Sequence, residues 1–311
     1  MTPTTDLGTG VQRFAVTGAT GWLGRAFLDV LAQTLGATAL SERVTAFASQ
    51  PRTISVAGTA IDVRSLADLP SHPHDVLVHL AFLTRGHVAI LGVERYTAEN
   101  IEITTRVLAA IQAQRPAAIC YSSSGAVYGL DGGGDLTADP YAELKRLDEH
   151  ALQGAAADVG ARLIVARVFN VAGPWASQRG YAIVDMIMQA QAGGPLSIRA
   201  RGPVRRAYMD VSDLASVLVA AACEPDGPAE TVFDTSGEVV EMADLATRVV
   251  DVLKTPIAIE RTWDPKAPAD DYVGHPAACD ELFARLGLAR RSLDDQILRT
   301  AEFIATTPRT A

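Results

Sequence analysis

The sequence predicts an α/β protein, built as a doubly wound parallel sheet with a smaller, discontinuous C-terminal lobe. From residue 12 to about residue 170, short apolar runs alternate with longer stretches of helical spacing. A glycine-rich turn separates the first run from the first helical stretch, and after residue 170 glycines and prolines divide the chain into shorter elements. Continuous apolar runs are typical of strands buried on both faces, and their alternation with helices implies parallel crossovers.

The expected elements of the first part follow in order. Strands are expected at "RFAVTG", "RVTAFAS", "TISVAGTAID", "DVLVHLAF", "AAICYSSS" and "ARLIVARVFN", with helices at 22–35, 88–113 and 140–158. In the helix at 88–113, Ile101, Thr104, Leu108 and Ile111 recur at helical spacing and are expected on one face.

The later part is expected to return once to the main sheet. "AYMDVSDLASVLVAAAC" is typical of a helix and "ETVFDTSG" of a strand, and the chain then ends with helices near 276–286 and 291–306. We therefore expect a flexible leader at 1–10, a dinucleotide-binding domain at 11–170 plus about 206–236, and a substrate-binding lobe at about 171–205 plus 237–311.

Composition excludes several classes of protein. With 311 residues, 48% of them apolar, the chain is long enough for a substantial core. A net charge of −9 argues against broad nucleic-acid or membrane-surface binding. The three cysteines are too few for a disulfide framework and fit a reducing cytoplasm, and the six histidines form no metal-binding pattern. The opening residues lack the features of a signal peptide, and no run of 18 apolar residues suggests a membrane span.

The turn "VTGATGWLG" lies between the first strand and the first helix. Gly18, Gly21 and Gly24 keep this turn free of side chains, so backbone N–H groups and the helix dipole can face a pyrophosphate. A tight turn without a ligand is the alternative. The strand before it and the helix after it predict a Rossmann-type dinucleotide-binding fold.

The stretch "DPYAELKR" places Tyr141 and Lys145 four residues apart at the start of a helix. This spacing puts both side chains on one helix face. A nearby cation stabilises the phenolate, which makes Tyr141 a candidate acid or base. An ordinary amphipathic helix is the alternative explanation.

Six motifs in the same order resemble those of the extended short-chain dehydrogenase/reductases, the NAD-dependent epimerase/dehydratase family. They span about residues 13–222. The motifs are "TGATGWLG", "HLAF", "YSSSGAVYG", "PYAELK", "RVFNVAGP" and "RRAYMDVSDL".

The resemblance implies a catalytic trio. Lys145 would bind the nicotinamide ribose and acidify Tyr141, Ser124 would hydrogen-bond the reacting oxygen, and Tyr141 would exchange a proton with it. The cofactor-binding residues implied in the same way are Gly18, Thr20, Gly21, Trp22, Leu23, Gly24, Ser49, Arg52, Asp62, Val63, Leu80, Ala81, Phe82, Asn100, Ser122, Tyr141, Lys145 and Phe169.

The end of the second strand bears on the choice between NAD and NADP. Members that prefer NAD carry an acidic residue there, whereas this chain has Ala48 and Ser49, with Arg52 nearby. We therefore expect the protein to bind NADP(H) with a slight preference over NAD(H). Asp62, followed by Val63, matches the position that contacts adenine in the family; a helix N-cap is the alternative role for Asp62.

The reaction expected from these residues is reduction of a nucleotide-sugar ketone. The family's dehydratases carry an Asp-Glu pair after the catalytic serine, but this chain has Gly125 and Ala126 there, which disfavours dehydration. The alternatives are a nucleotide-sugar epimerase that retains NAD, a reductase of a non-sugar ketone, and a non-catalytic cofactor-binding protein.

A substrate site is expected in the second lobe. Arg206 matches the arginine that holds a nucleoside diphosphate in the family, and its fork of donors suits phosphate; a solvated basic loop is the alternative. Asn170 matches a substrate-contacting asparagine, and a turn asparagine is the alternative. The family's second phosphate arginine is missing, and only Lys266 stands near its place. The helices at 88–113 and 140–158 correspond to the dimer interface of the family, so a homodimer is also expected.

Overall fold

The computed structural model describes residues 12–130, 136, 138–176 and 179–306, so the leader expected at 1–10 lies outside the described residues. The chain divides into two compact units, one of Met1–Val168 and Ala215–Phe233, and one of Phe169–Leu214 and Asp234–Ala311. Residues 206–214, which we expected in the first unit, thus belong to the second. The reason is that Val204–Asp210 is a strand of a separate sheet.

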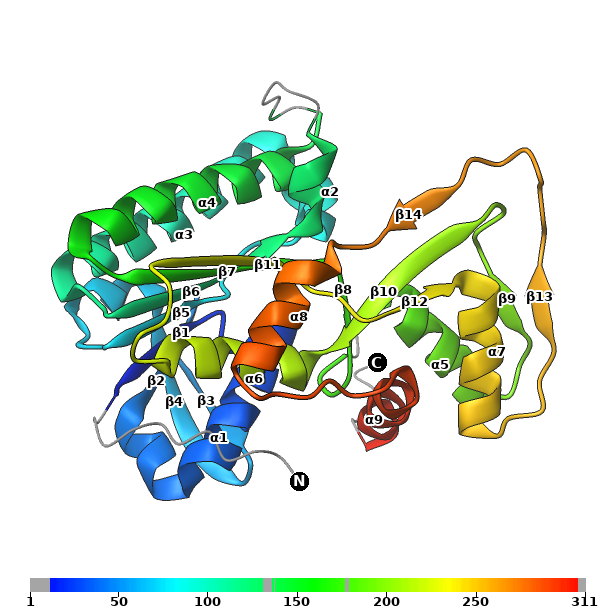
Figure 1. Ribbon diagram of the computed structural model, residues 1–311, viewed down its shortest axis with the longest axis horizontal. Helices are drawn as coiled ribbons and strands as arrows, with labels where there is room; N and C mark the ends of the chain where they lie inside the picture. Colours follow the sequence, from blue (N-terminus) through cyan, green and yellow to red (C-terminus); the bar gives the residue numbers. More distant parts are fainter. Residues whose placement is uncertain (1–11, 131–135, 137, 177–178, 307–311) are drawn as a thin grey trace. The chain divides into compact units, whose positions relative to one another are not determined.

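The first unit contains an eight-stranded sheet (Figure 1). In chain order its strands are β1 (Phe14–Thr17), β2 (Val44–Ala48), β3 (Arg52–Val56), β4 (Thr59–Ser65), β5 (Val76–His79), β6 (Ala118–Ser124), β7 (Arg162–Val168) and β11 (Glu230–Asp234). Their order across the sheet is β11-β7-β6-β5-β1-β2-β4-β3. The pairings from β4 across to β7 are all parallel, as expected from the alternation of strands and helices. The fold is therefore the doubly wound Rossmann type.

Helices cover both faces of this sheet. They are α1 (Trp22–Arg43), α3 (Val93–Gln114), α4 (Pro140–Val159) and α6 (Val211–Cys223), and the short helix α2 (Val88–Leu91) packs against α3. Figure 1 shows α3 and α4 over one face and α1 and α6 over the other. Under α3 and α4, buried side chains such as Phe47, Val107, Ile111 and Leu152 form a continuous apolar core.

Three local expectations about this unit are wrong. The single strand expected at "TISVAGTAID" is a hairpin, because Ala57 and Gly58 both adopt positive φ (47° and 82°) and turn β3 antiparallel onto β4. The helix expected at 88–113 is broken at Gly92, where φ is 76°. Ile101 was expected on one face with Thr104 and Ile111, but it is 50% exposed while they are buried, because the buried stripe runs through Asn100, one residue away.

The second unit is built on smaller sheets. Its strands are β8 (Asn170–Ala172), β9 (Leu196–Ile198), β10 (Val204–Asp210), β12 (Glu238–Glu241), β13 (Ile259–Arg261) and β14 (Asp270–Tyr272). β10 pairs with β8, β12 and β14, and β9 pairs with β13. The helices are α5 (Ala182–Ala192), α7 (Met242–Leu253), α8 (Pro276–Arg285) and α9 (Leu293–Thr306). The run "ARLIVARVFN" is therefore two strands, β7 and β8, in different sheets.

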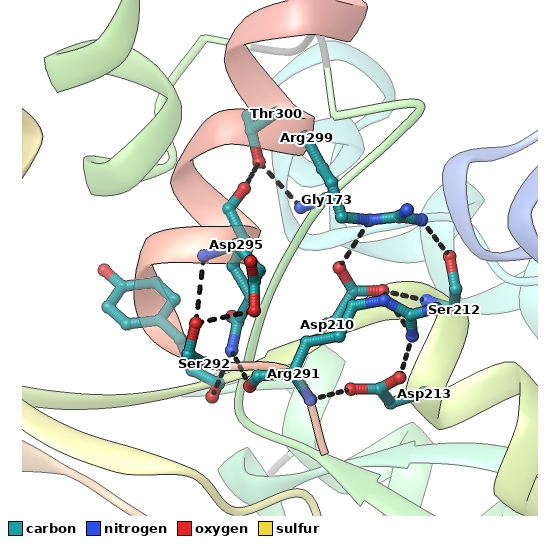
Figure 2. Close-up of polar contacts among 11 residues, drawn as sticks. Gly173, Asp210, Ser212, Asp213, Arg291, Ser292, Asp295, Arg299 and Thr300 are labelled. Carbon is teal, nitrogen blue, oxygen red and sulfur yellow. Dashed lines mark hydrogen bonds and ion pairs between the residues drawn. The ribbon is translucent and has the colours of Figure 1, made fainter. Parts of the chain in front are cut away.

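A buried charge network anchors α9 to β10 (Figure 2). Asp210 at the end of β10 is fully buried; its carboxylate lies 3.1 Å from Arg299 Nε and accepts from Ser212 N. Arg291 donates its backbone N–H and its guanidinium to Asp213. Because breaking a buried pair leaves an uncompensated charge, these contacts fix α9 on the strand that carries Arg206.

None of the helices within the described ranges is long and apolar enough to cross a membrane. The same ranges hold no cluster of three or more His, Cys, Asp or Glu side chains that could bind a metal. Cys120, Cys223 and Cys279 are all free thiols.

Candidate active site

The glycine turn sits at the carboxyl end of β1. Gly18 has φ of 68°, and a Cβ there would lie 2.7 Å from the backbone of Leu80 and Ala81, so only glycine fits. Gly21 begins α1 without a side-chain cap, and the first turn of α1 has no acidic residue. The positive end of the helix dipole is therefore not compensated by a side chain of α1, which suits an anion such as a pyrophosphate.

Gly24 and Gly21 differ in the space around them, which gives a first prediction. A Cβ on Gly24 would lie 2.2 Å from Gly18 O, whereas one on Gly21 would meet the same atom at 3.4 Å. We expect Gly24→Ala to destabilise the chain by about 1–3 kcal/mol, because backbone must move. Gly21→Ala should change stability by about 0.5 kcal/mol or less, since it adds no clash. Chemical denaturation of both variants without added nucleotide checks this, and equal losses would contradict the role assigned to Gly24.

Tyr141 is positioned by the start of α4. The Asp139 carboxylate caps the helix by accepting from Ala142 N at 3.1 Å, and Pro140 occupies the first turn. Arg85 pairs with Asp139 at 2.9 Å, and its guanidinium carbon lies 5.2 Å from the centre of the Tyr141 ring. The cap, the proline and the arginine together fix where the phenol leaves the helix.

Ser124 and Lys145 are held on the neighbouring strand and helix. Ser124 ends β6, where its hydroxyl accepts from Ala126 N and caps the 3-10 turn at Gly125–Gly129. Since α4 packs on both β6 and this turn, the three catalytic candidates come from adjoining elements. Lys145 is 3% exposed, and its Nζ donates to Ser122 O at 2.7 Å. Burial lowers the pKa of Lys145 to about 8, and the carboxylates of Asp148 and Glu149 oppose this effect.

Aromatic rings surround the lysine. Its Nζ lies 3.8 Å from the centre of the Phe82 ring and 4.8 Å from that of Tyr121. Phe82 also meets Tyr141 edge to face, with ring centres 5.7 Å apart. Phe82 therefore touches both members of the Tyr-Lys pair, and the cation–π contacts offset part of the cost of burying the ammonium.

The segment after β5 is held at two points. Thr17 Oγ1 accepts from Leu80 N and Ala81 N and lies 3.0 Å from His79 Nδ1, so its one proton is directed to that nitrogen. Burial lowers the pKa of His79 to about 3, and the ring is neutral. Asn100 is fully buried and accepts from Leu83 N at 2.9 Å. Leu80, Ala81 and Phe82 are thus fixed beside Gly18, and Asn100 acts on this segment through backbone contacts.

The residues expected near the adenosine lie at the other edge of the sheet. Ser49 and Arg52 are exposed, and Arg52 begins β3. Asp62 lies inside β4 and its carboxylate accepts from Thr53 Oγ1 at 3.0 Å, so the alternative N-cap role is wrong: Ser65 caps the turn that follows. Val63 is buried in the core. A direct contact of these side chains with adenine stays a prediction.

The residues expected to bind substrate lie together in the second unit. Asn170 Nδ2 donates to Ala207 O at 3.2 Å and to Tyr272 O at 3.3 Å, so Asn170 joins strands and is not a turn residue. Arg206 pairs with Asp270 at 2.7 Å, its side chain is 19% exposed, and it lies over the Tyr272 ring. The Phe169 ring is 4.6 Å from that of Tyr272. Arg206 is therefore an ordered, partly buried guanidinium and not a solvated loop residue.

Sequence reasoning missed several side chains that shape these sites. Those side chains are Arg85, Tyr121, Asp148, Asp270 and Tyr272. Asp148 had a usable signal, because a carboxylate three residues after Lys145 shares its helix face. The other four become neighbours of the site only through tertiary pairing.

The first unit, with its nucleotide-type turn and the Ser124, Tyr141 and Lys145 side chains, defines a dinucleotide-dependent enzyme of the extended short-chain dehydrogenase/reductase type. The family model "NAD dependent epimerase/dehydratase family" matches residues 14–234, and the chain belongs to that family. No protein with a curated description matches the sequence.

Solved structures share the fold over nearly the whole chain. The UDP-N-acetylglucosamine 4-epimerase of Methanobrevibacter ruminantium M1, in complex with UDP-N-acetylmuramic acid, is 21% identical; the match covers 95% of this chain and 98% of that one, with a TM-score of 0.73. The UDP-glucose 4-epimerase of Brucella ovis, in complex with NAD, is 20% identical over 94% and 98% of the two chains, with a TM-score of 0.73. The Bordetella bronchiseptica enzyme WbmF, in complex with NAD⁺, is 21% identical over 95% and 93%, with a TM-score of 0.72.

Proposed function

We propose that the protein is an NAD-dependent nucleotide-sugar epimerase. Its main support is the start of α4, which holds Tyr141 over Phe82 and buries Lys145 against the strand that ends in Ser124. Family membership and the similar fold of several nucleotide-sugar epimerases favour epimerisation over the ketone reduction that we expected first. A nucleoside diphosphate sugar is the proposed substrate, with Arg206 on its phosphates.

The glycine turn fits a dinucleotide. Gly18 and Gly24 keep side chains out of the turn at the start of α1, where the backbone is closely packed, and a turn without side chains at a helix N-terminus suits a pyrophosphate. NAD, when bound, supplies a site that accepts a hydride from the substrate carbon and returns it.

The protein's residues would then control the proton and the position of the sugar. Tyr141 Oη would take the hydroxyl proton as the carbon is oxidised, and would return it to the same oxygen when the carbon is reduced on its other face after the sugar turns. Ser124 hydrogen-bonds the same oxygen and holds it against Tyr141. Lys145 provides the positive charge that stabilises the phenolate. Inversion needs no net change in the oxidation state of either molecule.

A nucleotide-sugar ketoreductase is the second candidate. The end of β2 favours it: Ala48 and Ser49 offer no carboxylate for a ribose hydroxyl, and Arg52 is exposed close by in the chain. These features tolerate a 2′-phosphate, so NADP(H) is the cofactor of this alternative.

Identifying the nucleotide that co-purifies with the protein separates the two candidates. Tightly held NAD, together with conversion of a UDP-sugar into its epimer without added cofactor, supports the epimerase. An empty protein that binds NADPH at least tenfold more tightly than NADH, and consumes it in the presence of a keto sugar, would support the reductase.

We also propose that the chain forms a homodimer through α3 and α4. Ile101 on α3 is 50% exposed and Leu147 on α4 is 42% exposed, and apolar side chains on adjoining helices favour association. Light scattering should give twice the chain mass of 32.8 kDa for the wild type and the single mass for the double variant Ile101→Lys, Leu147→Lys. A wild-type monomer at micromolar concentration would contradict the proposal.

A further inference from the structure

We propose that Asp148 is a positioning residue for Lys145. Its carboxylate, fixed by Tyr121 and Thr104 inside the first unit, holds the neighbouring ammonium in its charged form against the Phe82 and Tyr121 rings. The inference rests on the proposed function in one respect, which is the role of Lys145 in stabilising the Tyr141 phenolate.

The carboxylate is buried and held from two elements. Asp148 is 5% exposed. The Tyr121 hydroxyl on β6 donates to Asp148 Oδ2 at 3.0 Å, and Thr104 Oγ1 on α3 lies 2.8 Å from Asp148 Oδ1. Asp148 stands three residues after Lys145 on α4, so the two side chains share one helix face.

Burial raises the pKa of Asp148 above its ordinary value, whereas the ammonium of Lys145 and the hydroxyls of Thr104 and Tyr121 oppose that rise and favour the ionised carboxylate. Each carboxylate oxygen of Asp148 faces one hydroxyl donor, and an ionised carboxylate accepts only. Thr104 has a single proton, and Asn100 O also lies 3.2 Å from its hydroxyl, so the shorter bond to Asp148 is the stronger of the two. Burial and the adjacent carboxylate hold the pKa of Tyr121 well above its ordinary value, so this hydroxyl stays a donor at every working pH.

The groups facing Lys145 show why Asp148 matters most. His79 on β5 is neutral, Tyr121 is protonated, and Thr104 on α3 carries no charge. Glu149 on α4 is paired with Arg167, so the positive charge of Arg167 offsets much of the negative charge of Glu149. The other phenols around the pair are Tyr96 on α3 and Tyr141 on α4. The carboxylate of Asp148 is therefore the main negative charge left to balance the buried ammonium.

Loss of this charge should make Lys145 easier to deprotonate. Burial alone favours the neutral amine, and a nearby anion opposes that preference. A neutral Lys145 could neither support a Tyr141 phenolate nor present a charged donor to a ribose. Asp148 would in this way set the highest pH at which the site works, without touching substrate.

The lysine content makes a direct test practical. The chain's lysines are Lys145, Lys254 and Lys266, and the latter two are exposed. In protein labelled with ¹³C-lysine, the Cε signal of Lys145 should titrate at about pH 8 in the wild type. In Asp148→Asn it should titrate about one pH unit lower. Lys145→Met assigns the signal by its loss.

Matched controls separate charge from packing. Tyr121→Phe and Thr104→Val each remove one donor to the carboxylate but leave its charge in place. Both should move the Lys145 titration by less than half as much as Asp148→Asn does. Equal shifts in all three variants, or no shift in Asp148→Asn, would overturn the proposal.

The wild type supplies a second measurement if Asp148→Asn does not fold. In protein labelled with ¹³C-aspartate, the Cγ signal of Asp148 should show an inflection at the pH where Lys145 titrates, because the coupling acts in both directions. Absence of that inflection would contradict the proposed coupling between Asp148 and Lys145. Neither titration requires turnover, so failure of the proposed epimerase activity would leave this result readable.

Discussion

Replacing Tyr141 by Phe should lower kcat by about 10²–10⁴-fold, because no other hydroxyl of α4 can take the substrate proton. The variant removes one oxygen and keeps the ring that meets Phe82 edge to face and lies under Arg85. Binding of NADH, followed by calorimetry, should change by less than threefold, since the glycine turn and Lys145 are intact. A loss in kcat without a loss in binding is the signature of a group that acts in the transition state.

Tyr181→Phe is the matched control for this prediction. Tyr181 is also a partly exposed tyrosine next to a helix start, but it precedes α5 in the second unit. Its variant should retain wild-type kcat. Full activity in Tyr141→Phe would remove the proton-transfer role and with it the proposed mechanism.

Lys145→Met should reduce kcat/KM by about 10²-fold or more while the folded chain remains intact. Methionine has a similar length and can pack its thioether between the Phe82 and Tyr121 rings. The loss comes from removing the only buried ammonium among the described residues, which is needed to stabilise a Tyr141 phenolate. Lys254→Met, on an exposed lysine, is the control and should behave as wild type.

The free energy of unfolding of the wild type, compared with that of Lys145→Met, also tests the pKa of Lys145. The folded chain releases the Lys145 proton at about pH 8, whereas the unfolded chain holds it up to the ordinary value of 10.5. Between these values the unfolded state binds more protons, so the free energy of unfolding rises with pH. Relative to Lys145→Met, the wild type should gain up to about 3 kcal/mol across this window. If the difference in the free energy of unfolding between the two proteins stays constant from pH 7 to pH 10, burial does not lower the pKa of Lys145.

Local patterns predicted most of the first unit. The glycine turn between β1 and α1, the Tyr-Lys spacing on α4 and the strands β1, β2, β5 and β6 are all set by residues close in sequence, and each lies where it was expected. The start of α4 is equally local, since Asp139 and Pro140 are the capping residues that the sequence shows. Thus the trio Ser124, Tyr141 and Lys145 could be proposed from the sequence alone.

The features that the sequence did not predict depend mostly on contacts between residues far apart in the chain. Tyr121 and Asp148 are 27 residues apart and Asp210 and Arg299 are 89 apart, so neither contact has a local signature. Residues 207–210, expected as the start of a helix, are the end of strand β10, whose partners β8, β12 and β14 place it in the second unit. The hairpin at Ala57–Gly58 was missed because alanine rarely adopts positive φ.

The most direct test is to incubate the purified protein with a UDP-sugar in D₂O and to follow the sugar by NMR. We expect inversion at one carbon with its hydrogen retained and no deuterium incorporated, because the hydrogen leaves and returns as hydride while only the Tyr141 proton exchanges with solvent. No net NAD(P)H should be formed or consumed. Deuterium at the inverted carbon, or oxidation of the UDP-sugar to a keto sugar with stoichiometric reduction of NAD(P)⁺ in place of inversion, would contradict the epimerase.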